Sequence, residues 1–211
     1  MMKALIYKDL ISIKNALLLQ FVIIIGLGIY FYKENQLVLI PLFFILIPII
    51  LLGMVFGIDN QYSTDKYLIS SGISRKKIVF SRYTIIWFMS IFAMALSFVV
   101  GFNKNPLTKE IPLILILSSL FFITSIVGVV ELPLMYKFGA EKARLVFVIL
   151  YFLVFAFFST VSSNKEWLLE YVNKGLTMDK TLLSLIIFAI TIIVHSISVF
   201  ISIKIFENKE L

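Results

Sequence analysis

The chain has 211 residues, of which 61% are hydrophobic and only 15% are charged, and its formal net charge is +7. This composition excludes a soluble domain and indicates an integral membrane protein. The absence of cysteine from the sequence excludes disulfides, thiolate catalysis and cysteine metal sites.

Residues 1–15 predict an amphipathic helix that lies on the membrane surface. The apolar residues on one side of this helix are Met2, Leu5, Ile6, Leu10 and Ile13. Asp9 falls inside the apolar arc, so we expect the helix to pack against protein as well as lipid. No small-residue cleavage signature follows it, so we expect the segment to be retained.

Six apolar stretches follow, and each is near the roughly 20 residues that a membrane-spanning helix needs. They cover about residues 16–32, 37–58, 83–102, 111–135, 145–161 and 181–206. No linker-like segment separates them. We therefore expect an all-α integral membrane protein with six transmembrane helices and a single membrane domain over residues 1–211.

The longest polar interruption between the spans is residues 59–82. Within it, the spacing of Thr64–Ser70 is compatible with a helix, and Gly72 breaks that helix. Ser74 is a suitable N-cap for a second helix that starts at Arg75. The segment therefore predicts a helix, a turn and a helix that leads into the third span.

Two interpretations of this basic segment stay open. In the first, anionic lipid headgroups attract its basic residues, an interaction worth about 1 kcal/mol for each residue. These residues are Arg75, Lys76, Lys77 and Arg82. In the second, the preceding YSTDKYLISSG stretch, which mixes aromatic, acidic and apolar residues, docks into a groove of another protein.

Charge placement predicts the orientation of the chain. Most of its 19 lysines and arginines lie on the side that holds both termini, residues 59–82 and a loop at residues 136–144. The positive-inside rule places this side in the cytoplasm. Because topology accounts for the positive charge, we expect no nucleic acid partner.

The residues offer little for catalysis. Apart from tyrosines and from Lys204 at the cytosolic end of the last span, the ionisable residues inside the spans are His195 and, near a cytosolic end, Glu131. One histidine cannot make a metal site, and neither HExxH nor GxSxG occurs, so we expect no enzyme and no catalytic, metal or cofactor-binding residues. His195 is either hydrogen-bonded between helices or part of a substrate path. Glu131 makes an ion pair or helix-end contact, or else anchors a moving cytosolic element to the bundle.

The source of energy for any transport is also constrained. The sequence has no GxxxxGK[ST] phosphate-binding loop, so we expect no ATP site in this chain. Carriers driven by ion gradients bury several charged residues along an ion path, and this chain has very few in its spans. The sequence therefore favours a separate ATPase.

Three stretches carry a resemblance to a known family: MKALIYKDL near the start, DKYLISSGISRKKIVFSRY between the second and third spans, and LPLMYKFGAEKAR after the fourth. In these stretches and in the order of its elements the chain resembles the permease subunits of type-2 ABC exporters. It is most similar to the small six-span permeases of Gram-positive bacteria that export phenol-soluble modulins, a virulence function.

The resemblance implies a permease that forms a dimer, expected to be a homodimer, and binds two copies of a cytosolic ABC ATPase, which holds ATP and Mg. It implies that residues 59–82 contain short cytosolic coupling helices. The residues expected to contact the ATPase are Asp65, Tyr67, Leu68, Arg75 and Lys76, with Gly139, Glu141 and Lys142 as a second, smaller contact.

The resemblance also implies a location in the bacterial cytoplasmic membrane and a substrate that is an amphipathic or hydrophobic peptide, cytolytic or antimicrobial. Polar candidates for the substrate path are Ser90, Ser97, Thr124, Ser125 and His195. The alternative is a non-transporting accessory or immunity protein that sequesters a toxic peptide in the lipid bilayer. An ATPase gene next to this one would favour the permease.

Overall fold

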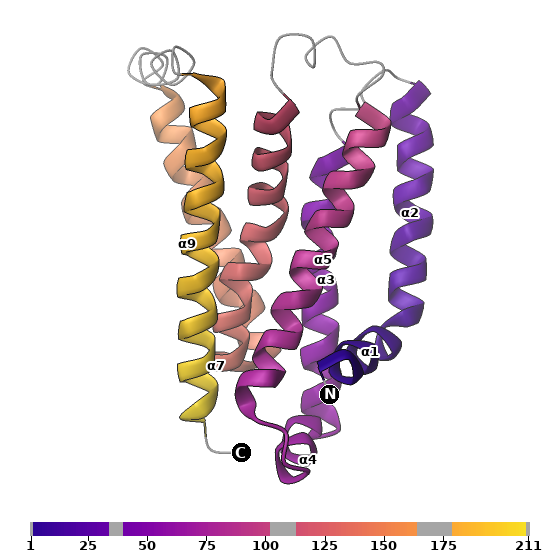
Figure 1. Ribbon diagram of the computed structural model, residues 1–211, viewed down its shortest axis with the longest axis vertical. Helices are drawn as coiled ribbons and strands as arrows, with labels where there is room; N and C mark the ends of the chain where they lie inside the picture. Colours follow the sequence, from indigo (N-terminus) through magenta and orange to yellow (C-terminus); the bar gives the residue numbers. More distant parts are fainter. Residues whose placement is uncertain (1, 34–39, 102–112, 164–178, 210–211) are drawn as a thin grey trace.

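The computed structural model describes residues 2–33, 40–101, 113–163 and 179–209, and the regular structure in these ranges is helical (Figure 1). The all-α prediction is therefore confirmed. The helices are α1 (Met2–Ser12), α2 (Lys14–Lys33), α3 (Ile40–Gln61), α4 (Thr64–Ser70), α5 (Arg75–Gly101), α7 (Leu113–Ser163) and α9 (Lys180–Glu207).

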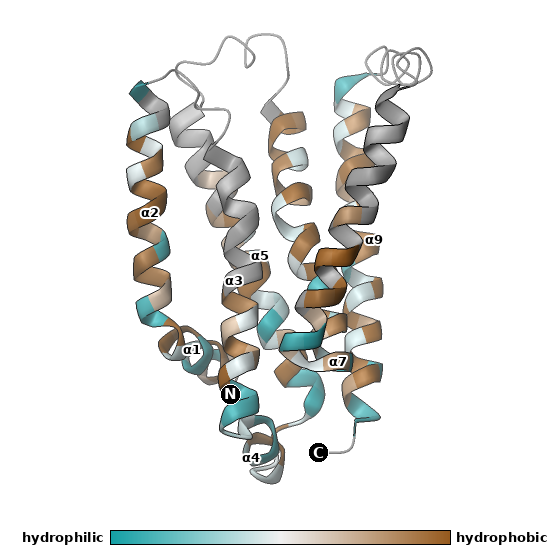
Figure 2. Ribbon diagram, turned by 180° about the vertical axis from the view of Figure 1, so that it is seen from behind, coloured by the Kyte–Doolittle hydropathy of each residue, from teal (hydrophilic) through white to brown (hydrophobic). Residues whose placement is uncertain are grey.

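The long helices stand side by side, and the two short helices α1 and α4 lie at one end of the bundle (Figure 1). The C-terminal end of α9 lies at the same end. Figure 2 shows hydrophilic residues gathered there, below apolar helix surfaces. We call this end, formed by α1, α4 and the last turn of α9, the α4 end.

The number of membrane crossings is only partly visible. In the described part of the chain, two helical segments are long and apolar enough to cross a membrane, Ile114–Ala143 and Lys180–Glu207. The pair of helices Met2–Ser12 and Lys14–Tyr30, bent by 67°, adds a third if it counts as one broken span. The six predicted spans thus stay a prediction.

The predicted loop at residues 136–144 is wrong, because these residues are helical on both sides of Gly139. α7 contains two helical arms that meet at a kink at Gly139, where φ is 80° and ψ is 169°. Only glycine adopts this backbone conformation without a steric penalty. A single residue therefore makes the turn for which a longer loop was expected.

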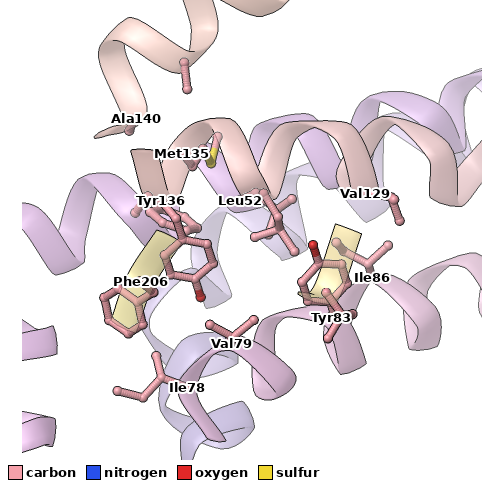
Figure 3. Close-up of a cluster of buried hydrophobic side chains, with 14 of the residues drawn as sticks. Leu52, Ile78, Val79, Tyr83, Ile86, Val129, Met135, Tyr136, Ala140 and Phe206 are labelled. Atoms are coloured by element: carbon pink, nitrogen blue, oxygen red, sulfur yellow. The ribbon is translucent and has the colours of Figure 1, made fainter. Parts of the chain in front are cut away.

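The main core lies toward the α4 end and joins side chains of α1, α3, α5, α7 and α9 (Figure 3). Tyr136 packs beside Phe206 with 4.9 Å between the ring centroids. At Gly128 the helices α5 and α7 approach so closely that an added Cβ would lie 2.8 Å from Ile86 Cδ1. These contacts fix α5, α7 and α9 against one another.

A hydrogen-bond chain crosses this core at Pro133, which lies inside the first arm of α7. Proline has no N–H to donate to the carbonyl four residues earlier, here that of Val129. Ser198 Oγ on α9 donates to the Val129 carbonyl instead, at 2.5 Å. Since its hydrogen is used there, Ser198 accepts from the Tyr83 hydroxyl at 2.5 Å, and Ser202 donates to Tyr83 at 2.9 Å. The chain ties α5, α7 and α9 together.

Candidate functional site

The helix, turn and helix predicted within residues 59–82 are confirmed. Ser63, with φ 50°, precedes α4, and the first helix covers Thr64–Ser70. Gly72 reverses the chain with φ 82°. The Ser74 carbonyl accepts from the Lys77 N–H at 2.9 Å where α5 begins. Residues with positive φ therefore stand on both sides of α4.

α4 has one packed side and one open side. Leu68 is partly buried against the main core, as are Ile69 and Ile73 beside it. Tyr67 points outward with 69% of its surface exposed, and Tyr62 just before α4 is 64% exposed. An exposed aromatic side chain on a fixed helix can contact a partner protein at low entropic cost.

Arg82 is buried, so the interpretation of this residue as a lipid headgroup anchor is wrong. Its side chain is 1% exposed and donates from Nη2 to Asp59 Oδ2 at 2.5 Å and to Asp65 Oδ1 at 3.1 Å. Its guanidinium carbon lies 3.9 Å from the ring centroid of Phe56 and 5.2 Å from that of Tyr136. Carboxylates and aromatic faces both stabilise a cation out of water.

A second cation extends this group of charges to α1. Lys8 Nζ lies 2.8 Å from Asp59 Oδ1 and 2.8 Å from Asp9 Oδ1. Burial raises the pKa of Asp9 although Arg82 and Lys8 oppose that rise. Burial lowers the pKa of Lys8, but the nearby carboxylates outweigh it and raise that pKa overall. We call Lys8, Asp9, Asp59, Asp65 and Arg82 the Arg82 cluster.

The Arg82 cluster was missed in the sequence because Asp59 and Arg82 each stand one residue outside a predicted span. Two signals pointed to it. Asp9 falls in the apolar arc of the first helix, and the structure leaves its side chain only 3% exposed. Opposite charges also flank the facing ends of the second and third spans. A buried group of paired charges accounts for both of these signals.

Arg75, predicted to contact an ATPase, is engaged within the chain. Its Nη1 lies 2.8 Å from the carbonyl oxygen of Phe206 and 3.0 Å from that of Lys209, and it also contacts the Glu207 carbonyl. A cation beside the carbonyls of the last helical turn stabilises a helix C-terminus. Lys76 is 63% exposed and lies 3.7 Å from the Glu207 carboxylate.

The second predicted contact lies beside the first. Glu141 and Lys142 are exposed just after the Gly139 kink. A Cβ placed on Gly139 would lie 3.8 Å from Asn60 Nδ2, near the end of α3 that leads to α4. The two predicted contact regions are thus neighbours at the α4 end.

Glu131 is fully buried, with 0% of its surface exposed, on the first arm of α7. Its side chain is therefore enclosed by the protein. Its role as an anchor of a moving cytosolic element stays a prediction.

No group of three or more His, Asp or Glu side chains in the described ranges is arranged to hold a metal ion.

Among the polar candidates for a substrate path whose side chains the structure describes, His195 lines a large apolar pocket, and Ser90, Thr124 and Ser125 do not. Ser90, Thr124 and Ser125 are all buried. Thr124 and Ser125 donate to carbonyls of their own helix, at Leu120 and Phe121, and line no described pocket. Ser97 lies on α5, and its side chain is outside those that the structure describes.

The pocket that His195 lines lies between α5, α7 and α9. The pocket has a volume of about 1020 Å³, and aromatic side chains including Trp87 and Phe121 line it. The His195 ring stacks on Phe121 with 6.0 Å between centroids and 14° between planes. Sequence reasoning named His195 but not the pocket, because the lining comes from three helices that are distant in the chain.

Comparison with known proteins gives a family. A family described as ABC-2 family transporter protein matches residues 4–207, nearly the whole chain. Neither the curated proteins nor the solved structures gave a significant match. The matched region contains the Arg82 cluster, α4 and the pocket.

Proposed function

The chain belongs to the ABC-2 family of transporter proteins, and we propose that it is the permease of an exporter that moves amphipathic or hydrophobic peptides out of a bacterial cell. As a member of this family the chain is a membrane transport subunit, and its ATPase is a separate chain. The match over residues 4–207 is the observation that carries the transporter part of the proposal.

The proposed ATPase contact is the open side of α4 around Tyr67, with Glu141 and Lys142 as the smaller contact. The exposure of Tyr67 and its fixed position support this assignment. Asp65, Leu68 and Arg75 face the body of the protein, so their proposed role is to hold the surface that the ATPase contacts. Lys76, more exposed, remains a direct contact.

Movement of α4 would reach the long helices through the Arg82 cluster. Asp65 belongs to α4, Asp59 to α3 and Arg82 to α5, and all three side chains meet. A short helix tied by buried charges to two long helices moves with them as one body. ATP and Mg bound by the partner would thus drive the spans without any nucleotide site in this chain.

The proposed assembly has two permease chains and two ATPases in the bacterial cytoplasmic membrane, with both termini in the cytoplasm. Exposed apolar residues along α2, such as Leu18 and Val22, give surface for lipid or for a second copy. Peptide export and the phenol-soluble modulin class rest on the resemblance in the three quoted stretches.

The test is reconstitution. The permease is co-expressed with the ABC ATPase encoded beside it, purified, and placed in proteoliposomes with a fluorescent amphipathic peptide. The proposal predicts a stable complex and peptide movement that needs ATP and both proteins. If the chain binds the peptide but neither binds an ATPase nor moves the peptide, the sequestering role is correct instead.

A further inference from the structure

The apolar pocket between α5, α7 and α9 is open toward the side of the bundle. Along α9 its lining extends from Ser184 to Ile203, which at 1.5 Å per residue is roughly 30 Å. Lining residues such as Leu185, at 63% exposed, and Phe200, at 68%, stand at its outer edge. The pocket therefore has the length of a lipid chain and is reached from the membrane.

Most polar groups in the lining are already satisfied. Ser118 Oγ donates to the Leu115 carbonyl at 3.0 Å. Ser184 and Thr191 donate in the same way to carbonyls of α9, each at 2.7 Å. Hydroxyls bonded to their own helix leave largely apolar walls, which favour an apolar occupant.

His195 differs from these hydroxyls. Its side chain is 6% exposed, and its Nδ1 lies 2.6 Å from the Thr191 carbonyl oxygen. A carbonyl can only accept, so Nδ1 carries the hydrogen, and in the neutral imidazole Nε2 is then an acceptor. Among the described residues that line the pocket, Nε2 is the buried side-chain atom without a hydrogen-bond partner. It has almost no accessible surface, so a ligand in the pocket reaches Nε2 by displacing the side chains that cover it.

A buried acceptor without a partner favours a ligand that carries a hydrogen-bond donor. A ligand that donates to Nε2 removes the cost of leaving that atom unpaired. A hydroxyl suits the site best, since a charged group would be left without a counter-ion and an amide would bring a carbonyl that needs a donor of its own.

We propose that this pocket binds an uncharged long-chain alcohol dissolved in the membrane, whose hydroxyl donates to His195 Nε2 while its chain lies along α9. The site goes beyond the export function and does not depend on it. Binding is measured on the permease alone, so a failure of peptide transport leaves this proposal standing.

Tryptophan fluorescence tests the proposal directly. Trp87 lines the pocket with its ring centroid 6.3 Å from that of His195, and Trp167 is the one other tryptophan in the sequence. The W167F variant in lipid nanodiscs is titrated with a long-chain alcohol brominated close to its hydroxyl, because bromine quenches a nearby indole. The methyl ether of the same alcohol is the matched ligand that lacks the donor.

The proposal predicts saturable quenching, with the alcohol binding about fivefold more tightly than the ether, the value of one net hydrogen bond. His195→Phe removes the acceptor and should make the two ligands equal, whereas Ser196→Ala, next to it, should keep the preference. Quenching that never saturates, equal affinities in the parent protein, or a preference that survives His195→Phe would overturn the proposal. The comparison in the parent protein decides the matter even if the phenylalanine variant fails to fold.

Discussion

The Arg82 cluster and the apolar pocket bury polar groups in opposite ways. In the cluster, side chains from α1, α3, α4 and α5 bring charges together, and Arg82 Nη2 touches two carboxylates. In the pocket, hydroxyls bond to their own helices and one imidazole nitrogen has no partner. The cluster fixes helices to one another, whereas the pocket leaves room between them.

This difference separates two tasks within one helix bundle. The cluster lies where α4 meets the long helices, the place at which a force from outside would enter. Most of the pocket lies farther from α4, along α5 and α9. The side chains there can be displaced without separating an ion pair. Substitutions should therefore be costly at the cluster and mild at the pocket.

The largest effect is expected for Arg82→Met. Loss of this cation leaves Asp59 and Asp65 without their main partner. Removal of one member of a buried ion pair lowers the free energy of unfolding by about 3–5 kcal/mol. Chemical unfolding of the purified protein in detergent measures the change. Lys76→Met is the matched control, because its side chain is 63% exposed and its ion pair with Glu207 is long. Equal stability of the two variants would show that the cluster does not hold the helices.

Ser198→Ala is expected to come next. It leaves the Val129 carbonyl and the Tyr83 hydroxyl short of a partner in the core, at a cost of about 1–3 kcal/mol. Ser196→Ala removes a hydroxyl two residues away that is exposed and bonds only to the Ile192 carbonyl, so its effect should stay within about 0.5 kcal/mol. A loss of similar size in both variants would remove the special role given to Ser198.

A smaller loss is expected for Gly139→Ala. The kink at Gly139 combines φ 80° with ψ 169°, a region essentially restricted to glycine, so a side chain there costs about 1–2 kcal/mol in backbone strain. Gly26 lies inside α2 with nothing within 4 Å of an added Cβ, so Gly26→Ala should be neutral or stabilise by about 0.5–1 kcal/mol. Thermal unfolding of both variants decides whether the turn between the arms of α7 requires glycine.

The smallest effect is expected for His195→Phe. The phenylalanine ring keeps the stack on Phe121 and removes a buried acceptor that lacks a partner, so stability should change by less than about 1 kcal/mol. Chemical unfolding in detergent gives the value. A loss as large as that of Arg82→Met would place His195 among the groups that hold the helices together.

Local patterns in the sequence predicted the helices well. Turn chemistry placed α4 at Thr64–Ser70 and the start of α5 at Arg75, and the structure confirms both boundaries. The same reasoning failed at residues 136–144, because polar composition alone suggested a loop where one glycine makes the turn.

Contacts between distant residues could not be derived in this way. Asp59 and Arg82 looked like separate polar residues at the ends of two spans, and only the fold brings them within 2.5 Å. Ser198 gained its importance from Pro133, a residue on another helix that leaves a carbonyl without its usual donor. A periodic pattern describes one helix at a time, whereas both of these sites are made by several.

The most direct test of the central claim is a cross-link from α4. The chain has no cysteine, so Tyr67→Cys and Ile29→Cys each provide one site for a photoactivatable label. Both native side chains are exposed, but Ile29 lies near the far end of α2. In the complex with the ABC ATPase, the label at position 67 should cross-link to the ATPase and the label at position 29 should not. An intact complex with no cross-link from position 67, or with equal yields from both positions, would contradict the claim that α4 is where the ATPase acts on this permease.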